Sequence, residues 1–530
     1  MKESKEHATD SYSEYMLQLF EKTSRTRSKA IGQFFTPGII YKPMVECAYK
    51  LLAVNDRKTI RIIDPFCGDG RLLTYFLELA EQETHNWEKI SVYAWDIDSS
   101  ALSVAEKNIS MAAARAPYDV SVQAECCDAF LVDSNRLELF DACVTNPPWS
   151  STKSLKEKSF NDKTSYEKYQ KLAGEYTKEL CNRYPEVRGS RSFGTGAINL
   201  SRFGLALSKS LVRDGGVCSI VMPSSFTADT SSRKLRESLG TEYDLVNLDY
   251  YSAELKLFEG ADQAGVAITL YKQKTNRQGS VTSHLLNGQK SLQADEKFWR
   301  YSDANGHAIP LGYSQEEIEI IEKMTAFPVL GDNASIHLGR EVDETRVADK
   351  LCRHSSFRFV KGFMILPYKL LNDEQWFYND EIAKIPASSY DEKVVWRDIS
   401  RASQNKRIKA TLLPAGYVAG NSLGVATAND KYYLRAFLGI LNSRTFEFVA
   451  RTVLTTNHVS AGALKRMPFP KLCNKQVSDL AERVDAILRN PDDYGLYEDI
   501  DRLVAQCYGL NDEEIDVINR NVNYRNLNEY

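Results

Sequence analysis

Strand-like and helix-like segments alternate along the first part of the chain. The β-branched run 60–63 leads through D-P-F-C-G-D-G into R-L-L-T-Y-F-L-E-L-A, an apolar stretch typical of a helix. The apolar run 90–95 is followed by S-S-A-L-S-V-A-E-K-N, and further strands are predicted at 120–124 and up to Thr145. Because strands that alternate with helices form parallel sheets, we predict an α/β domain with a mostly parallel, twisted sheet and helices on both faces.

Two helices are predicted ahead of the first strand. One is amphipathic, around Tyr15 to Lys22, within an N-terminal arm that ends at residue 31. The other runs from about Lys42 to Leu52, and Pro37 and Pro43 bracket the turn into it. Thr36 stands at the approach to this helix, where unpaired backbone N–H groups favour a carboxylate.

The pattern changes after Lys272. Polar sequence leads to a capped helix at Ser314 to Met324, and we predict a domain boundary at about residue 325. Beyond it lie segments rich in strands and turns, and then terminal helices that are expected to pack back on them. The predicted parts are a helical arm, an α/β domain, a linker with one helix, a mixed α+β domain and C-terminal helices, at residues 1–31, 32–275, 276–325, 326–470 and 471–530.

Candidate ligand-binding groups follow the predicted strands. Gly68 and Gly70 form a Gly-x-Gly turn before a helix N-terminus, where backbone can approach a ligand closely. Asp96 ends the second strand, the position at which nucleotide-type folds grip a ribose diol, whereas Asp98 is better placed to cap the next helix. Since ligands of open α/β sheets lie outside the carboxyl ends of the strands, these groups should share one crevice.

The fourth predicted strand ends in N-P-P-W. Asn146 offers a side-chain carbonyl, Pro147 a backbone carbonyl, and Trp149 a flat apolar ring. Two acceptors beside an aromatic face suit a planar base that carries an exocyclic amino group. The alternative is a proline-rich turn that merely closes a buried strand.

Composition sets broad limits. A chain of 530 residues, 43% hydrophobic and 26% charged, should form two or more globular domains. Neither a membrane span nor a signal peptide is visible, so we expect a soluble, cytoplasmic protein without a membrane partner. The ten cysteines are scattered without a C-x-x-C pair, which indicates reduced thiols and no zinc or other metal site.

Charge gives a mixed indication. A net charge of −4 and a pI near 6.1 argue mildly against a nucleic-acid partner. The local run from Trp396 to Lys409 is nevertheless basic, and a solvated surface is its alternative reading. As candidate DNA-contacting cations it contributes Arg397, Arg401, Lys406, Arg407 and Lys409.

Taken in order, the motifs resemble those of gamma-class, Taq-type DNA adenine-N6 methyltransferases of type II restriction-modification systems. They are G-Q-F-F-T-P at 32–37, D-P-F-C-G-D-G at 64–70, D-I-D-S-S-A-L at 96–102, C-C-D-A-F at 126–130 and N-P-P-W at 146–149. The similarity covers about residues 32–272. Trp149 departs from the commoner tyrosine or phenylalanine but keeps the ring. The later region, with V-A-G-N-S-L-G-V at 418–425, resembles target-recognition domains.

The resemblance implies a Rossmann-like domain that binds S-adenosylmethionine. By this resemblance Thr36 and residues 64–67 contact its methionyl end, Asp96 its ribose, and Asp128 with Phe130 its adenine. The implied cofactor-binding residues are Thr36, Asp64, Pro65, Phe66, Cys67, Gly68, Gly70, Asp96, Ile97, Asp128, Phe130 and Pro148. The implied catalytic residues are Asn146, Pro147, Trp149 and Phe258, and the alternative for Phe258 is a core residue at a strand end.

The implied reaction is methylation of adenine N6 in double-stranded DNA after the base leaves the duplex. Cytosine N4 is the nearer alternative, although Ser is then commoner where Asn146 stands; an RNA or protein-glutamine methyltransferase is the other. No P-D…[DE]-x-K nuclease signature is found, so we expect a monomeric modification enzyme that works with a separately encoded restriction endonuclease.

Overall fold

The computed structural model forms two compact units, residues 1–314 and 315–530. It describes residues 11–20, 35–54, 57–83, 85–160, 162–188, 198–258, 263–273, 278–286, 288–304, 306–344, 346–371, 376–401, 404, 406–454 and 457–522. Some predicted features lie partly outside these residues: the end of the first helix at Lys22, the start of G-Q-F-F-T-P at Gly32, and residues 259–262 after Phe258.

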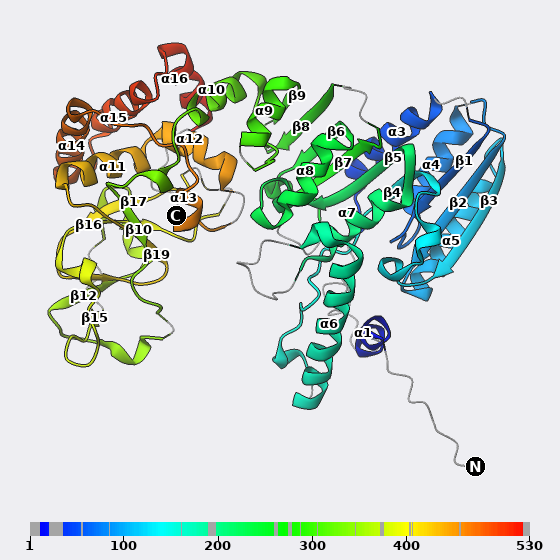
Figure 1. Cartoon of the computed structure of the whole chain (residues 1–530), viewed down its shortest axis with the longest axis horizontal. Coiled ribbons are helices and arrows are strands. Elements are labelled where there is room, and N and C mark those ends of the chain that lie inside the picture. The colour runs from blue at the N-terminus through cyan, green and yellow to red at the C-terminus, as the bar shows by residue number, and fades with distance from the viewer. Residues whose placement is uncertain are drawn as a thin grey trace. The chain divides into compact units, whose positions relative to one another are not determined.

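The first unit is built on a nine-stranded sheet in the order β3-β2-β1-β4-β5-β7-β6-β8-β9 (Figure 1). The strands are β1 (Thr59–Asp64), β2 (Lys89–Asp96), β3 (Asp119–Cys126), β4 (Phe140–Thr145), β5 (Val212–Pro223), β6 (Asp244–Tyr251), β7 (Gly265–Tyr271), β8 (Gly279–Leu285) and β9 (Gly288–Ala294). The strands β3, β2, β1, β4 and β5 are parallel to one another, whereas β7 is antiparallel to both β5 and β6. The predicted α/β class and the four predicted strands are confirmed.

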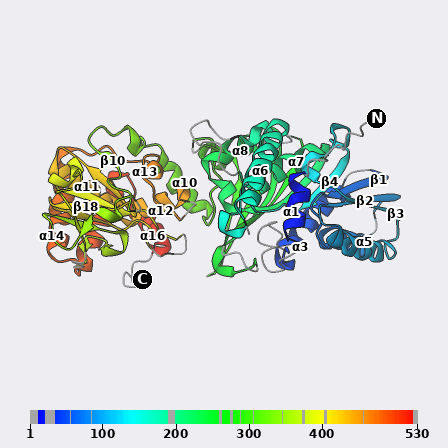
Figure 2. The same cartoon turned by 90° about the horizontal axis from the view of Figure 1, so that it is seen from below.

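Helices cover both faces of this sheet, as Figure 2 shows. On one face lie α3 (Gly38–Ala53), α4 (Arg71–Gln82) and α5 (Ser99–Ala113); on the other lie α7 (Leu200–Leu211) and α8 (Arg233–Thr241). Two further helices, α1 (Tyr12–Phe20) and α6 (Lys163–Arg183), pack against each other. Because both faces are covered, every residue of the central strand β4 is buried.

The strand order reverses between β1 and β4. The chain passes from β1 outward to β2 and β3, and then returns to the other side of β1 to form β4. Crossover connections on either side of this point lead away from it, which leaves a crevice at the carboxyl ends of the two strands. Asp64 ends β1 and Thr145 ends β4, so both residues lie at this end of the sheet.

Helix α3 begins four residues earlier than predicted, at Gly38, and contains Pro43. Proline cannot donate to the carbonyl one turn before it, which is that of Ile39. The hydroxyl of Tyr251 on β6 donates to this carbonyl at 3.2 Å and so compensates for the missing bond. A contact from a distant strand therefore allows the helix to begin at Gly38, whereas the local sequence predicts a start near Lys42.

The predicted linker 276–325 is largely wrong. Its first part forms β8 and β9, where β8 pairs in parallel with β6 and β9 pairs antiparallel with β8. Helix α9 (Glu296–Ala304) follows. The last helix of the predicted linker, α10 (Gln315–Thr325), packs against α16 (Asp512–Asn521) and belongs to the second unit, so the boundary lies ahead of it.

The second unit is mixed α+β, as predicted. Two four-stranded sheets have the orders β10-β19-β16-β17 and β11-β15-β12-β18, and β13 pairs with β14. The strands are β10 (His337–Gly339), β11 (Leu351–Cys352), β12 (Phe357–Val360), β13 (Ile365–Leu366), β14 (Lys369–Leu370), β15 (Phe377–Tyr378), β16 (Lys393–Arg397), β17 (Ala410–Leu413), β18 (Tyr417–Ala419) and β19 (Leu423–Thr427). The helices are α11 (Lys431–Asn442), α12 (Arg444–Val453), α13 (Ala461–Leu464), α14 (Asn474–Arg489) and α15 (Tyr494–Cys507), with α10 and α16. Within the described residues, none of the helices has the length and apolar character that crossing a bilayer requires.

Candidate functional site

A pocket opens at the carboxyl ends of β1 to β4, inside the first unit. It holds about 1150 Å³ of space not filled by atoms, its open mouth included. All the predicted cofactor-binding residues except Gly70 line it, as does Asn146. These lining residues are Thr36, Asp64, Pro65, Phe66, Cys67, Gly68, Asp96, Ile97, Asp128, Phe130 and Pro148.

Asp96 is held by the backbone around it. Its carboxylate accepts hydrogen bonds from the N–H of Gly68 and of Asp98, each at 2.8 Å. Gly68 can turn its N–H toward Asp96 because its φ is +54°, a backbone conformation that residues with a side chain rarely adopt. A carboxylate has about four lone-pair sites, so Asp96 retains acceptor capacity toward the pocket. Asp98 caps α5 by accepting from the N–H of Ser100, as predicted.

Gly70 is not among the residues that line the pocket, and its expected contact with the cofactor stays a prediction. It is the N-cap of α4, with φ +77°. A Cβ at this position would meet the Cα and Cβ of Ala105 on α5 at 3.0 Å. The second glycine of the Gly-x-Gly turn therefore serves the close packing of α4 on α5.

Asp64 and Thr145 connect the two strand ends. The hydroxyl of Thr145 donates to Asp64 at 2.6 Å, and the N–H of Phe66 donates to the same carboxyl at 3.1 Å. Asp64 is 1% exposed. Burial raises the pKa of Asp64 to about 7, with a smaller contribution from the neighbouring Asp96, although the two hydrogen bonds oppose the shift.

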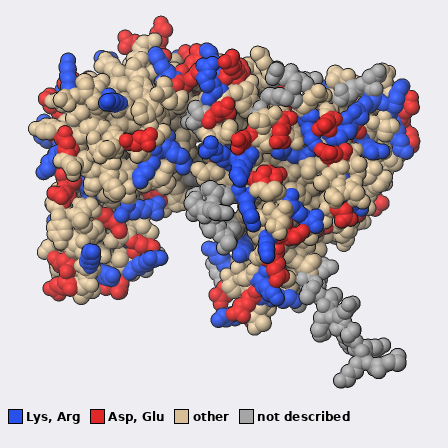
Figure 3. Space-filling model, viewed as in Figure 1, with Lys and Arg blue, Asp and Glu red and all other residues tan. Residues whose placement is uncertain are grey.

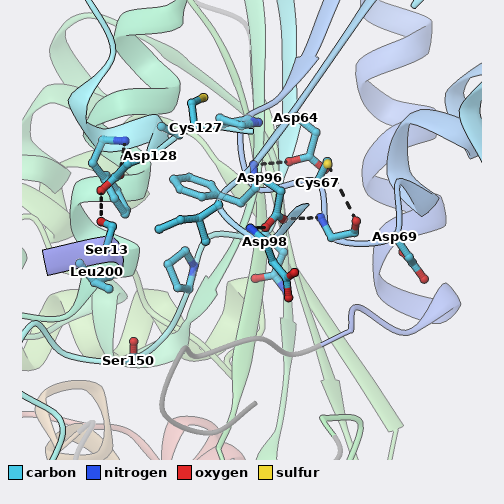
Figure 4. A pocket seen from close by; sticks show the side chains of 18 of the residues that line it. Ser13, Asp64, Cys67, Asp69, Asp96, Asp98, Cys127, Asp128, Ser150 and Leu200 are labelled. Atoms are coloured by element: carbon cyan, nitrogen blue, oxygen red, sulfur yellow. Dashed lines mark hydrogen bonds between the residues drawn. The ribbon is translucent and has the colours of Figure 1, made fainter. Parts of the chain in front are cut away.

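The chemistry of the lining suits a cation that carries a ribose and a planar ring. Figure 4 shows Asp64, Asp96, Asp98 and Asp69 gathered on one side of the pocket. Asp69 is paired with Arg71, which also lines the pocket, so the other three are the carboxyl groups that favour a bound cation. Phe66 and Phe130, whose ring centroids are 4.9 Å apart, provide an apolar wall. S-adenosylmethionine, with its sulfonium and ammonium groups, its ribose and its adenine ring, fits these carboxyl groups and this apolar wall.

Residues of α1 and α6 complete the pocket and were not predicted. Ser13 donates to Asp128 at 2.5 Å, as Figure 4 shows, and Tyr176 donates to the same oxygen at 2.9 Å. The rings of Tyr12 and Tyr176 stack with centroids 4.5 Å apart. An adenine ring would therefore have to use the other oxygen of Asp128, which already accepts from the N–H of Phe130. In the sequence, the tyrosines of the N-terminal helix were the signal that could have indicated that this helix packs at the pocket.

Asn146 lines the pocket, and two described side chains hold its carboxamide. Its Nδ2 donates to Oγ1 of Thr36 at 2.9 Å. Its Oδ1 accepts from the indole N–H of Trp149 at 3.0 Å. Thr36, expected to contact the cofactor, therefore lines the pocket and also contacts Asn146. The N-P-P-W segment is fixed further along by Asn199, whose Nδ2 donates to the Trp149 carbonyl at 2.9 Å.

Trp149 and Phe258 come together although they are 109 positions apart in the chain. Their ring centroids are 4.6 Å apart with the planes inclined by 54°. Both rings are buried in the core of the first unit and do not line the pocket. The packing agrees with the core alternative for Phe258; stacking on a base requires the two rings to move apart.

The basic run in the second unit does not form an exposed surface. Lys406, Arg407 and Lys409 are buried, so the expectation that they contact phosphates is wrong for this fold, as is the solvated alternative. Lys406 Nζ donates to the Asn442 carbonyl at 2.5 Å, and Arg407 donates to the carbonyls of Leu454 and Ser400. Burial lowers the pKa of Lys406 to about 8.

Of the same run, Arg401 is exposed and Arg397 is partly exposed. Arg397 donates to the carbonyl of Gly362 at 2.6 Å. On the face drawn in Figure 3, basic and acidic side chains are interspersed over the surface. This agrees with a net charge of −4 and leaves Arg397 and Arg401 as the members of the run able to meet an anion.

Comparisons with known proteins agree with the motifs. Residues 4–184 match the family model described as N-6 DNA methylase, which agrees with the resemblance to adenine-N6 methyltransferases at this coarser level. The Type II methyltransferase M.BanIII of Aneurinibacillus aneurinilyticus is 24% identical over 246 residues, which are 44% of this chain and 37% of the relative. The methylase subunit of the Type I restriction enzyme MjaIX of Methanocaldococcus jannaschii is 29% identical over 139 residues, 26% of this chain and 22% of the relative.

This chain thus spans well under half the length of these two relatives. Among solved structures, the Type IIL restriction-modification enzyme MmeI in complex with DNA matches with a TM-score of 0.58 and 12% identity, over 97% of this chain and 81% of that one. At this identity the likeness concerns the fold.

Proposed function

We propose that this protein transfers a methyl group from S-adenosylmethionine to N6 of adenine in double-stranded DNA, as the modification enzyme of a restriction-modification system. The observation that carries the proposal is the position of Asn146, at the carboxyl end of β4 and in the lining of the acidic pocket. An amide acceptor is thereby placed next to a site that suits a sulfonium cation. The family match of residues 4–184 supports the same reaction.

Asn146 and Pro147 activate the target. The N6 lone pair of adenine is delocalised into the ring, which makes the nitrogen a poor nucleophile. When its hydrogens bond to Oδ1 of Asn146 and to the Pro147 carbonyl, a pyramidal nitrogen with a localised lone pair is favoured. S-adenosylmethionine supplies the electrophilic methyl group when bound. The amide and carbonyl dipoles are fixed before the reaction, so little reorganisation is needed at the transition state.

The remaining site residues bind and orient. Asp96, oriented by the N–H of Gly68, holds a ribose, and Asp64 favours the cationic end. Phe66 and Phe130 contact the adenine of the cofactor. Trp149 and Phe258 receive the flipped base, once their mutual contact opens. The unstacking of the base costs a few kcal/mol, which contact with an aromatic ring at about 1–3 kcal/mol can offset.

The second unit is the proposed target-recognition domain. Its mixed strands and turns form a unit separate from the chemical site. Arg397 and Arg401 are the cations of the basic run that we retain as phosphate contacts, because phosphate contacts position a protein on DNA whereas base contacts specify sequence. We further propose that the enzyme is a monomeric methyltransferase of the gamma class. Its cognate restriction endonuclease would be a separate chain.

Nucleoside analysis tests the proposal. Plasmid DNA is incubated with the full-length protein and methyl-labelled S-adenosylmethionine, then digested and analysed by mass. N6-methyldeoxyadenosine is expected. N4-methyldeoxycytidine would favour the cytosine alternative, and label found in RNA or protein but not in DNA would refute a DNA methyltransferase.

Asn146→Ala provides the matched control. It should still bind S-adenosylmethionine, because the lost group aligns the target and not the cofactor. If the variant keeps more than about a tenth of the wild-type kcat, a loss of less than about 1.4 kcal/mol, the role assigned to Asn146 is wrong.

A further inference from the structure

The carboxamide of Asn146 can stand in two orientations that differ in which atom faces each neighbour. Rotating the side-chain amide by half a turn exchanges its oxygen for its NH₂ group at almost no cost in shape. Only one orientation presents an oxygen acceptor where the proposed function needs it. The residues around Asn146 therefore decide whether the acceptor is in place before a target base arrives.

Two hydrogen-bonding neighbours of Asn146 among the described residues differ in this respect. Thr36, at 2.9 Å, has a hydroxyl that both donates and accepts, so it can satisfy either end of the carboxamide. Trp149, at 3.0 Å, offers an indole N–H that can only donate. With the amide reversed, this N–H would face the NH₂ group, and two donors would confront each other. Of these two neighbours, Trp149 favours one orientation, whereas Thr36 can satisfy either.

The ring of Trp149 is placed independently of this hydrogen bond. Its partner Phe258 lies 4.6 Å away between centroids, and both rings are buried. Gly265 on β7 makes room for them: a Cβ there would lie 2.6 Å from Phe258 and 3.2 Å from Trp149. Asn199 holds the Trp149 carbonyl at 2.9 Å. Before a base enters, the indole N–H is thus presented to Asn146 from a fixed position.

We propose that Trp149 is a positioning residue whose indole N–H fixes the Asn146 carboxamide in the orientation that methyl transfer requires. This role is additional to that of its ring, and a phenylalanine at the same position lacks the donor while a tyrosine hydroxyl does not discriminate between oxygen and NH₂. The inference rests on the proposed function of Asn146. Because a carbonyl oxygen has two lone pairs, Oδ1 can accept from Trp149 and from the target amino group together.

A first experiment detects the hydrogen bond without any activity. The chain has six tryptophans, so the indole N–H signals of the uniformly ¹⁵N-labelled protein are few, and the one lost in Trp149→Phe belongs to Trp149. Asn146→Ala should shift this signal and leave that of Trp87 unchanged. An unmoved Trp149 signal would refute the bond, whatever the enzyme does.

A second experiment measures its effect on the reaction. Trp149→Phe should lower kcat about five-fold, as expected for the loss of one neutral hydrogen bond, with an unchanged Kd for S-adenosylmethionine. Trp87→Phe is the matched control: Trp87 is buried in the same unit, and its indole nitrogen has no hydrogen-bond partner among the residues that the structure describes. It should leave kcat within about two-fold of wild type.

A third variant separates the ring from its N–H. Replacing Trp149 by benzothienylalanine keeps the bicyclic ring but puts sulfur in place of the N–H group. A kcat as low as that of Trp149→Phe supports positioning through the N–H, whereas a wild-type kcat would show that only ring area matters and would overturn the inference. If wild-type protein methylates no adenine, the proposed function fails instead, and the NMR result still decides the bond.

Discussion

Gly204 on α7 lies directly against Pro147 of the N-P-P-W turn. A Cβ at position 204 would lie 2.7 Å from Cγ of Pro147 and closer still to its Cβ. Both groups belong to rigid surroundings, a helix interior and a proline ring, so neither can yield without displacing backbone. The absence of a side chain at Gly204 thus sets how closely the turn that carries Asn146 approaches α7.

Gly204→Ala should reduce kcat strongly, by about ten-fold or more, because a shift of the turn by even part of an ångström misplaces the acceptors of N6. The cofactor Kd should change little. Gly174→Ala on α6 is the matched control, since a Cβ there meets only the end of Lys153 at 4.0 Å. Equal kcat values for the two variants would show that the turn tolerates displacement.

Replacing Asp96 or Asp98 by alanine should have different effects. Asp96→Ala removes the carboxylate that accepts from Gly68 N–H, so the Kd for S-adenosylmethionine should rise by about ten-fold to a hundred-fold through loss of a charge-assisted hydrogen bond. Asp98→Ala removes the cap of α5, which should cost about 1 kcal/mol of stability, and should weaken binding less than Asp96→Ala although Asp98 also lines the pocket. Calorimetry that finds the larger loss of affinity in Asp98→Ala would move the ribose contact to that residue.

Cofactor affinity should depend on pH through Asp64. Burial raises its pKa to about 7, so the carboxyl of the free protein is largely protonated below that pH. A bound cation favours the ionised form and lowers the pKa, so binding releases a proton there and the Kd should fall as pH rises toward about 8, then level off. Titrations in buffers of different ionisation enthalpy measure the released proton.

Two variants check this assignment. Asp64→Asn should weaken binding and abolish the pH dependence near neutrality. Thr145→Val removes a hydrogen bond that lowers the pKa of Asp64, so the midpoint of the pH dependence should move upward. A pH profile that survives in Asp64→Asn would assign the titration to another group.

Arg407 and Arg401 should behave oppositely although six residues apart. Arg407→Ala leaves the buried carbonyls of Leu454 and Ser400 without donors, and should destabilise the second unit by about 2–4 kcal/mol. Hydrogen exchange in peptides covering β16 and β17 measures this. Arg401→Ala should leave exchange unchanged but weaken binding to all DNA, with a salt slope smaller by up to about one phosphate contact. An unchanged salt slope would remove Arg401 from the DNA surface.

Local sequence determined the chemistry-bearing end of the sheet. The strands β1 to β4, the Asp98 cap and the turns after each strand depend on residues close together in the chain, and the structure has them where the pattern predicted. Because parallel strands present their carboxyl ends at one edge, Asp64, Asp96, Asp128 and Asn146 had to meet once the sheet formed.

Tertiary structure alone decided what depends on distant partners. Helix α1 closes the pocket through Ser13 because Asp128 and Tyr176 lie opposite it, and Pro43 fits inside α3 because Tyr251 bonds Ile39. The cations Lys406 and Arg407 are internal because carbonyls from α11 to the end of α12 receive them. The sequence shows a lysine or arginine in the same way whether its side chain is solvated or bonded to a buried carbonyl. The packing of distant elements decides which of the two occurs.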